Sequence, residues 1–166
     1  PNLIAVNNED ESEIELADLA TRKPAGRIAL PGCEGPTGLA FDPASGLALS
    51  SCANGKAALV DLRARRLVGL IDIGQGPDTV IWDGAHKRFL VPCGKSGSLS
   101  EVRIVRRKAI VAASSASETS ARTAAYDPVS GRVYLPAARF AAPVAPATRG
   151  TMEPGSFHIV VLAPSR

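Results

Sequence analysis

The sequence predicts an all-β fold, a β-propeller fragment of about three and a half four-stranded blades, on three observations. The stretch GPTGLAFDPASGLALSSC at 35–52 returns in altered form at 76–93 and at 120–137. The copies place one aromatic residue at the same position, with offsets of 41 and 44 residues: Phe41, Trp82 and Tyr126. A period of this length, built from short strands, is typical of a propeller blade.

An aspartate follows each of these aromatic residues and predicts a tight turn. Asp42, Asp83 and Asp127 occupy this position, and glycines follow at Gly46 and Gly131 in two of the three copies. Aspartate accepts hydrogen bonds from nearby backbone N–H groups, and glycine tolerates a positive φ. Each copy is therefore expected to begin with a β-hairpin.

The repeats divide the chain into blades at about 1–34, 35–75, 76–119 and 120–166, within one partial propeller domain spanning 1–166. In the first repeat, apolar stretches near 3–6, 14–19 and 27–30 predict three strands, with a polar loop at 7–13. Compared with the second repeat, the first lacks an innermost strand.

The second and third repeats contain the full set of four expected strands. These lie near 38–41, 47–51, 57–62 and 67–73, and then near 79–82, 88–92, 99–104 and 109–113. Runs such as VIW and FLV are apolar throughout, as expected for strands that are covered on both faces. The polar run at 114–120 is expected to be a loop between blades.

The fourth repeat begins with a hairpin at 122–137 and then departs from the pattern. The segment 138–155 is rich in Ala and Pro, and Pro removes the backbone donors that a central strand needs, so a long loop is expected there. A final strand is expected at 157–163, and a fourth strand is missing. Closed propellers usually have four to eight blades, so this chain is expected to belong to a larger ring and to self-associate through its open strands when alone.

Composition excludes few classes of function. The net charge of +3 neither requires nor excludes a nucleic-acid partner, and no apolar run is long enough to cross a bilayer. The three cysteines, Cys33, Cys52 and Cys93, do not have the spacing of metal ligands, and no motif indicates a metal or a cofactor. Cys52 and Cys93 occupy matching positions and are expected to be small buried side chains, while a disulfide remains an open alternative.

The pattern resembles the YVTN-repeat, YncE-like family of bacterial β-propellers. The resemblance rests on the unit GP-x-x-[apolar]-x-[aromatic]-D-P-x-x-G at Gly35 to Gly46, its relaxed copies at Gly76 and Ser120, and the ending YLPAARF followed by PGSFHIVVLA. The tetrapeptide that names the family is blurred here to LALS, FLVP and VYLP. The resemblance implies a seven-bladed ring, of which this chain is the C-terminal part, and export to the periplasm or secretion.

Two surfaces are candidates for binding. The turns of the last hairpin in each of the first three blades are basic, and we expect them to align as an arc on one face: Arg22, Lys23, Arg63, Arg65, Arg66, Arg106, Arg107 and Lys108. Such a basic arc favours an anionic partner such as nucleic acid. The alternative is that these charges only protect solubility and the outer strand edges.

Five polar residues are expected near the mouth of the central channel on the opposite face: Glu34, Thr37, Asn54, Asp78 and Arg122. Repeat alignment places Thr37, Asp78 and Arg122 at one position, where they are suited to hold a small ligand. Alternatively, Asp78 and Arg122 form only a structural ion pair across a blade boundary.

We therefore expect a non-enzymatic binding or scaffold propeller with an unknown protein or small-molecule ligand. The alternative is an enzyme of the lactonase or gluconolactonase type, in which Glu34, Asn54 and Asp78 are the residues available to surround a divalent ion. No G-x-S-x-G nucleophile motif supports catalysis, so no catalytic residue is assigned. His86 is expected in a solvated turn and His158 at a strand edge.

Overall fold

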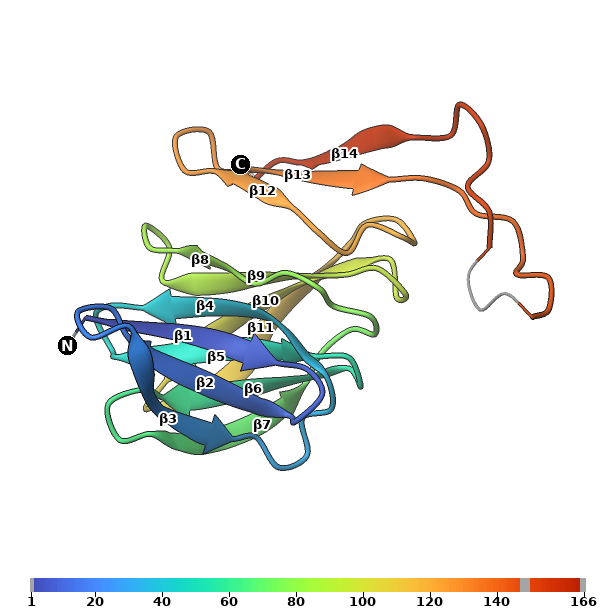
Figure 1. Cartoon of the computed structure of the whole chain (residues 1–166). Helices are drawn as coiled ribbons and strands as arrows, with labels where there is room; N and C mark the ends of the chain where they lie inside the picture. The colour runs from blue at the N-terminus through green and yellow to red at the C-terminus, as the bar shows by residue number, and fades with distance from the viewer. Residues whose placement is uncertain (1, 147–149, 165–166) are drawn as a thin grey trace.

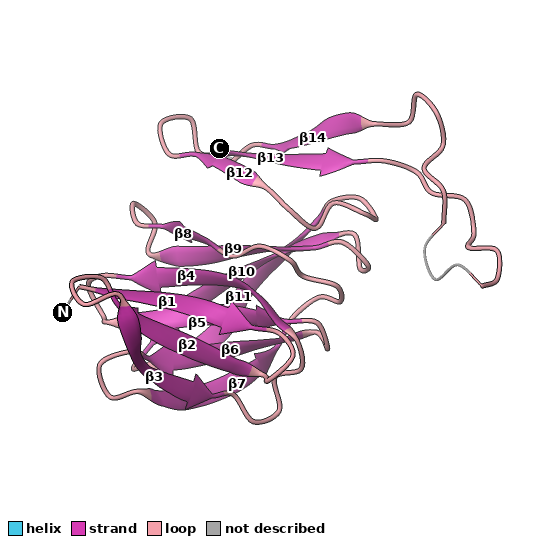
Figure 2. Ribbon diagram, in the orientation of Figure 1, coloured by secondary structure: helices cyan, strands magenta, loops and turns pink. Residues whose placement is uncertain are grey.

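The computed structural model describes residues 2–146 and 150–164, and these form fourteen β-strands and no helix. The strands build four antiparallel sheets, each connected in chain order, so the predicted all-β class is confirmed (Figures 1 and 2). The described residues contain no helix with the length and apolar character needed to span a bilayer.

The first sheet contains β1 (Leu3–Asn8), β2 (Glu13–Asp18) and β3 (Lys23–Ala29). The second sheet contains β4 (Pro36–Asp42), β5 (Leu47–Cys52), β6 (Lys56–Asp61) and β7 (Arg66–Asp72). The third sheet contains β8 (Ile81–Asp83), β9 (Arg88–Cys93), β10 (Ser98–Val105) and β11 (Lys108–Ala116). The fourth sheet contains β12 (Ala125–Asp127), β13 (Arg132–Ala137) and β14 (His158–Leu162).

The strand orders agree with the incomplete first and fourth repeats. The two middle sheets have four strands, whereas the first and fourth have three in the part of the chain that the structure describes. By repeat alignment, the first sheet lacks the counterpart of β4 and the fourth lacks the counterpart of β11. One expectation was wrong: β11 continues to Ala116, so the first three residues of the polar run 114–120 are strand. An exposed outer strand has little need of apolar side chains, which explains the misleading polarity.

A separate apolar cluster joins each pair of neighbouring sheets. Ile14 and Val60 belong to the cluster between the first and second sheets, Leu59 and Phe89 to the next, and Leu90 and Leu135 to the last. Strands β5, β6 and β9 are buried along nearly their whole length, because neighbouring sheets cover both of their faces. The sheets therefore follow one another face to face in a propeller-like array (Figure 1).

Neighbouring sheets approach closely where a glycine lies on the innermost strand. A Cβ atom built on Gly38 in β4 would lie 2.5 Å from the backbone nitrogen of Val80. Backbone atoms cannot move aside as a flexible side chain can, so Gly38 is required by this contact. The third and fourth repeats carry Thr79 and Thr123 at the matching position, so this glycine is not a general feature of the repeat.

The predicted turn role of the repeated aspartates is confirmed. Asp42 accepts a hydrogen bond from the backbone N–H of Ala44 (2.9 Å), and Asp127 accepts one from that of Val129 (2.9 Å). Gly46 and Gly131 both have a positive φ. The aspartate side chain thus closes the first hairpin of the repeat and sets the register of its two strands.

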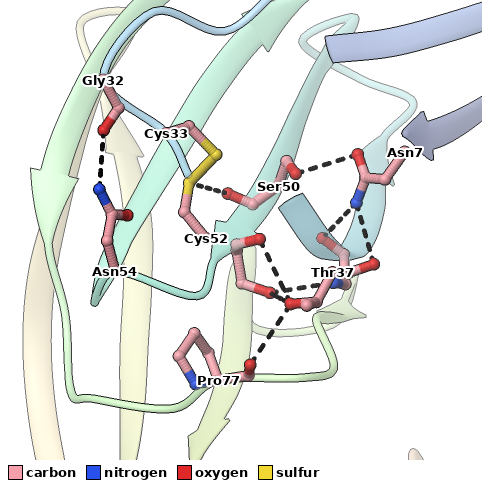
Figure 3. Close-up of a disulfide and its surroundings, with 10 residues drawn as sticks. Asn7, Gly32, Cys33, Thr37, Ser50, Cys52, Asn54 and Pro77 are labelled. Atoms are coloured by element: carbon pink, nitrogen blue, oxygen red, sulfur yellow. Dashed lines mark hydrogen bonds between the residues drawn. A yellow bond between two sulfur atoms is a disulfide. The ribbon is translucent and has the colours of Figure 1, made fainter. Parts of the chain in front are cut away.

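A disulfide resolves the cysteine alternatives that the sequence left open. Cys33, in the connection between the first two sheets, is bonded to Cys52 at the end of β5, and both are buried (Figure 3). Cys93 is a buried free thiol, as expected for it. One repeat later, Gly74 occupies the position that matches Cys33, and a Cβ built there would lie 2.6 Å from Cys93 Cβ. The two positions that form the Cys33–Cys52 disulfide are therefore occupied one repeat later by Gly74 and Cys93, which lie close together without a covalent bond.

Removing this disulfide should lower the free energy of unfolding. The bond joins residues separated by 19 positions, and closing a loop of this size stabilises a protein by about 3 kcal/mol. We expect Cys33→Ser/Cys52→Ser to lose roughly this amount in urea unfolding under non-reducing conditions, and dithiothreitol to destabilise the native protein but not this variant. Cys93→Ala is the control and should keep the dithiothreitol effect. Thiol titration of the unfolded wild-type protein should find one free thiol before reduction and three after; three before reduction would contradict the assignment.

Candidate ligand pocket and basic arc

A pocket of about 400 Å³ lies where the loops of the second, third and fourth sheets meet. Its wall includes Thr37, Asp78, Lys95 and Arg122, and Phe140 contributes an aromatic surface. Three of these residues, Thr37, Asp78 and Arg122, were predicted to share a position near the channel mouth. The structure therefore brings together three of the five residues predicted for this site.

The polar groups of the pocket carry opposite charges but do not fully neutralise each other. Arg122 Nε lies 3.3 Å from Asp78 Oδ2, so the expected ion pair across the repeat boundary is present. The terminal nitrogens of Arg122 form no hydrogen bond with the residues that the structure describes. Lys95 is exposed on the same wall and, within the described chain, has no ion-pair partner. Two cations therefore face one carboxylate in the pocket.

Glycines place both cations against the pocket wall. A Cβ built on Gly76 would lie 2.6 Å from Lys95 Cγ, and one built on Gly94 would lie 2.7 Å from Arg122 Cβ. Gly76 also has a positive φ of 66°, which favours glycine on conformational grounds. The absence of a side chain at these two positions lets the loops pack against each other closely enough to form one continuous wall.

Thr37 has a mainly structural role in the site, because its hydroxyl contacts other residues of the chain. Its hydroxyl lies 3.0 Å from Ser51 Oγ and 3.3 Å from the carbonyl oxygen of Pro77, so it connects β4 and β5 to the loop that precedes β8. The Asn7 side chain donates to the carbonyl of Thr37 (3.0 Å), which extends the connection to the first sheet (Figure 3). Thr37 thus fixes the position of the loop that carries Asp78.

The other two predicted residues, Glu34 and Asn54, do not line the pocket. Glu34 is exposed, and Asn54 donates to the carbonyl of Gly32 (3.1 Å) in the connection beside the disulfide (Figure 3). The side chains proposed to surround a divalent ion are therefore not gathered around Asp78. Among the described residues, no group of three or more His, Cys, Asp or Glu side chains is placed to hold a metal ion.

Lys95 and Phe140 are among the pocket residues that the sequence analysis missed, for different reasons. Lys95 follows β9 at the position that Asn54 occupies after β5, so the alignment that indicated Asn54 also contained the signal for Lys95. Phe140 lies in the Ala/Pro-rich loop, which has no counterpart in the other repeats. Repeat alignment had no means of placing this residue.

The residues of the predicted basic arc lie on neighbouring turns at the opposite end of the sheets, and all eight are exposed. Arg65 reaches the first sheet and donates to the carbonyl of Ala25 (2.9 Å). Arg107 reaches the second sheet and pairs with Asp61 (2.6 Å). These contacts join the β2–β3, β6–β7 and β10–β11 turns into one surface, on the left side of Figure 1.

Acidic residues reduce the charge of the arc at its base. Asp18 and Asp61 end β2 and β6 and accept hydrogen bonds from backbone N–H groups of the turns that follow. The backbone hydrogen bond from Thr21 is the main cause that lowers the pKa of Asp18. The bond from Ala64 has the largest effect on Asp61 and, with Arg107, lowers its pKa despite partial burial. Both aspartates therefore stay ionised and hold the turns in shape.

A buried ion network lies beneath the turn that contains His86. Asp83 is only 1% exposed and accepts hydrogen bonds from Arg88 Nε (2.8 Å) and from His86 (2.8 Å). Arg88 also donates to Glu101 (2.6 Å), which Arg103 contacts as well (2.8 Å). Burial alone would raise the pKa values of Asp83 and Glu101, but hydrogen bonds from these arginines lower both below their ordinary values. His86 is exposed, as expected for a residue in a solvated turn, and its ring also pairs with Asp83.

Comparisons with known proteins bear on the fold alone. No protein-family model matches this chain, and no curated protein sequence matches it. Among solved structures, the chain is similar to hydrazine synthase from Kuenenia stuttgartiensis, with a TM-score of 0.73 and 14% sequence identity. The alignment covers 98% of this chain and 46% of that chain. This similarity supports an all-β, propeller-like arrangement along nearly the whole sequence.

Acid should weaken the fold through Asp83 and Glu101. Because their folded pKa values are lowered, their contribution to stability is complete above their ordinary values of 3.8 and 4.5 and is lost as the pH falls through the folded values. We expect urea unfolding to show a steep loss of stability below about pH 4.5. Asp83→Asn should be less stable than wild type at pH 7, because it leaves Arg88 partly unpaired, but should depend less on acid. If the wild type and Asp83→Asn lost the same stability as the pH fell, this result would contradict the role assigned to Asp83.

Proposed function

We propose that this chain is part of a non-enzymatic binding propeller and that the pocket between its second, third and fourth sheets takes a small ligand with an anionic group. The observation that carries this proposal is that Lys95 and Arg122 line one pocket in which Asp78, paired with Arg122, is the only carboxylate among the described lining residues. Anions bound by lysine and arginine form charge-assisted hydrogen bonds, which are stronger than neutral ones.

The size and position of the pocket support this proposal. A volume of about 400 Å³ lies within the range of small-molecule sites. The pocket is formed by loops at the ends of packed strands, where a rigid scaffold holds polar side chains in place. Asp78 has a second effect, because it offers an acceptor for a hydroxyl or amino group of the ligand while it holds Arg122.

The proposal also includes the number of blades in the ring and the cellular location of the protein. The resemblance to YVTN-repeat propellers favours a closed ring of seven blades, to which this chain would contribute its four sheets. The outer face of the fourth sheet exposes Ile159 and Val161, as expected of a sheet that receives another blade, or a second copy when the chain is alone. The buried Cys33–Cys52 disulfide favours an oxidising location such as the periplasm or the cell exterior.

The basic arc supports a second binding function, for a polyanion such as nucleic acid. Arg65 and Arg107 are occupied in contacts between sheets, but Arg63, Arg66 and Arg106 are exposed and have no ion pair among the described residues. They lie on two neighbouring turns, β6–β7 and β10–β11, and this placement suits repeated contacts with phosphate groups. This surface and the pocket lie at opposite ends of the sheets, so the two functions are separable by mutation.

The pocket proposal is tested with inorganic phosphate and citrate as probes, using isothermal titration calorimetry. Lys95→Ala and Arg122→Ala should each weaken binding about tenfold through loss of a charge-assisted hydrogen bond. Asp78→Asn should tighten binding, because it removes the negative charge nearest the anion. Lys108→Ala, at the other end of the sheets, is the control and should bind as wild type does. Equal affinities in all five proteins would refute the pocket assignment.

The arc proposal is tested with a fluorescent single-stranded oligonucleotide at several salt concentrations. Arg63→Glu/Arg66→Glu/Arg106→Glu should weaken binding and reduce the slope of log K against log salt by roughly 0.7 for each phosphate group that the variant no longer neutralises. Arg65 and Arg107 are left intact because they connect sheets. Lys95→Glu is the control for a charge change outside the arc. An unchanged slope in the triple variant would argue against binding through these turns.

A further inference from the structure

Phe140 is an aromatic residue that the pocket holds in a partly exposed position. Its side chain is 46% exposed and lines the same pocket as Lys95 and Arg122. A large apolar side chain on a loop gains little stability when it is half in water. Its place beside two cations therefore requires a reason other than core packing.

The loop around Phe140 is a closed hairpin in the part that the structure describes. Phe140 pairs with Met152 in an isolated β-bridge, and the backbones on either side are joined by hydrogen bonds from Ala141 to Thr151 (2.9 Å) and from Glu153 to Arg139 (2.9 Å). The Arg139 and Glu153 side chains also form an ion pair (2.9 Å). These contacts fix the backbone on both sides of Phe140.

Ser120 connects this hairpin to the loops that carry the cations. Its hydroxyl donates to the carbonyl of Ala138 (2.8 Å) and accepts from the backbone N–H of the same residue (2.9 Å), two positions before Phe140. Its backbone N–H donates to Gly94 (2.8 Å), next to Lys95, and its carbonyl accepts from Arg122 (2.8 Å). Ser120 adopts a φ of 76°, which a non-glycine residue rarely does. Ser120 thus connects the backbone of Arg122 with the backbones beside Lys95 and near Phe140.

From these contacts we propose that the ligand carries a planar aromatic ring as well as an anionic group. The ring stacks on Phe140, and the anion binds Lys95 and Arg122. The inference rests on the function proposed above and narrows its ligand class. A ring and an anion linked by a few atoms fit a pocket of about 400 Å³. Nucleoside monophosphates and aromatic carboxylates share this chemistry.

Paired probes with and without the ring test the proposal by calorimetry. Adenosine monophosphate is compared with ribose 5-phosphate, and indole-3-acetate with acetate. We expect the aromatic member of at least one pair to bind the wild-type protein about tenfold more tightly, as one stacked ring contributes. The pair that shows the larger gain identifies the anion as phosphate or carboxylate.

Substitutions at Phe140 separate stacking from anion binding. Phe140→Ala should remove the advantage of the aromatic probe and leave the affinity of its ring-free partner unchanged, whereas Phe140→Trp should preserve the advantage. Phe157→Ala is the matched control, because Phe157 is 60% exposed and does not line the pocket. Ser120→Ala should reduce the advantage if it positions the ring.

The outcomes distinguish this inference from the function on which it rests. Equal binding of aromatic and ring-free anions to the wild-type protein, with both weakened by Lys95→Ala, would overturn the stacking proposal and leave the anion site standing. An aromatic advantage that survives Phe140→Ala would also overturn it, since the ring would then bind elsewhere. Failure of all four probes to bind the wild-type protein would overturn both proposals.

Discussion

Packing of one sheet face against the next is the interaction on which this structure depends. A short antiparallel sheet of three or four strands cannot bury two apolar faces by itself, so each sheet relies on its neighbours. Phe89 and Leu59 are buried in this way between the second and third sheets, as Ile14 and Val60 are between the first two. At Gly38 the approach is so close that no side chain fits.

This packing places the two candidate binding surfaces at opposite ends of the sheets. At one end, loops from three sheets converge, and small residues such as Gly94 let them form a shared wall with Lys95 and Arg122. At the other end, the turns are short and stand side by side, and their basic side chains form an exposed surface. Arg107, for example, extends from the β10–β11 turn of the third sheet and pairs with Asp61 of the second sheet. The compact ligand that we propose is matched to the first end, and the proposed polyanion to the second.

The sequence predicted most parts of the structure that repeat and missed contacts between segments that have no repeat counterpart. The aspartates after Phe41, Trp82 and Tyr126 located the hairpins because turn chemistry is local. The pocket was found in part, since residues at one repeat position lie at equivalent places around the array. Phe140 has no repeat counterpart, and the pairing of Cys33 with Cys52 depends on contacts between distant segments. Neither can be derived from periodicity.

Because of the disulfide, the first and the fourth sheets of the array are attached to their neighbours in different ways. The connection from the first sheet is covalently joined to the second sheet at Cys52, whereas the fourth sheet is held by an apolar cluster and by contacts such as the His158 to Glu118 pair (2.9 Å). If partial unfolding separated the fourth sheet from the third, Phe140 would move away with it. The ligand pocket would then open while the basic arc, carried by the first three sheets, stayed intact.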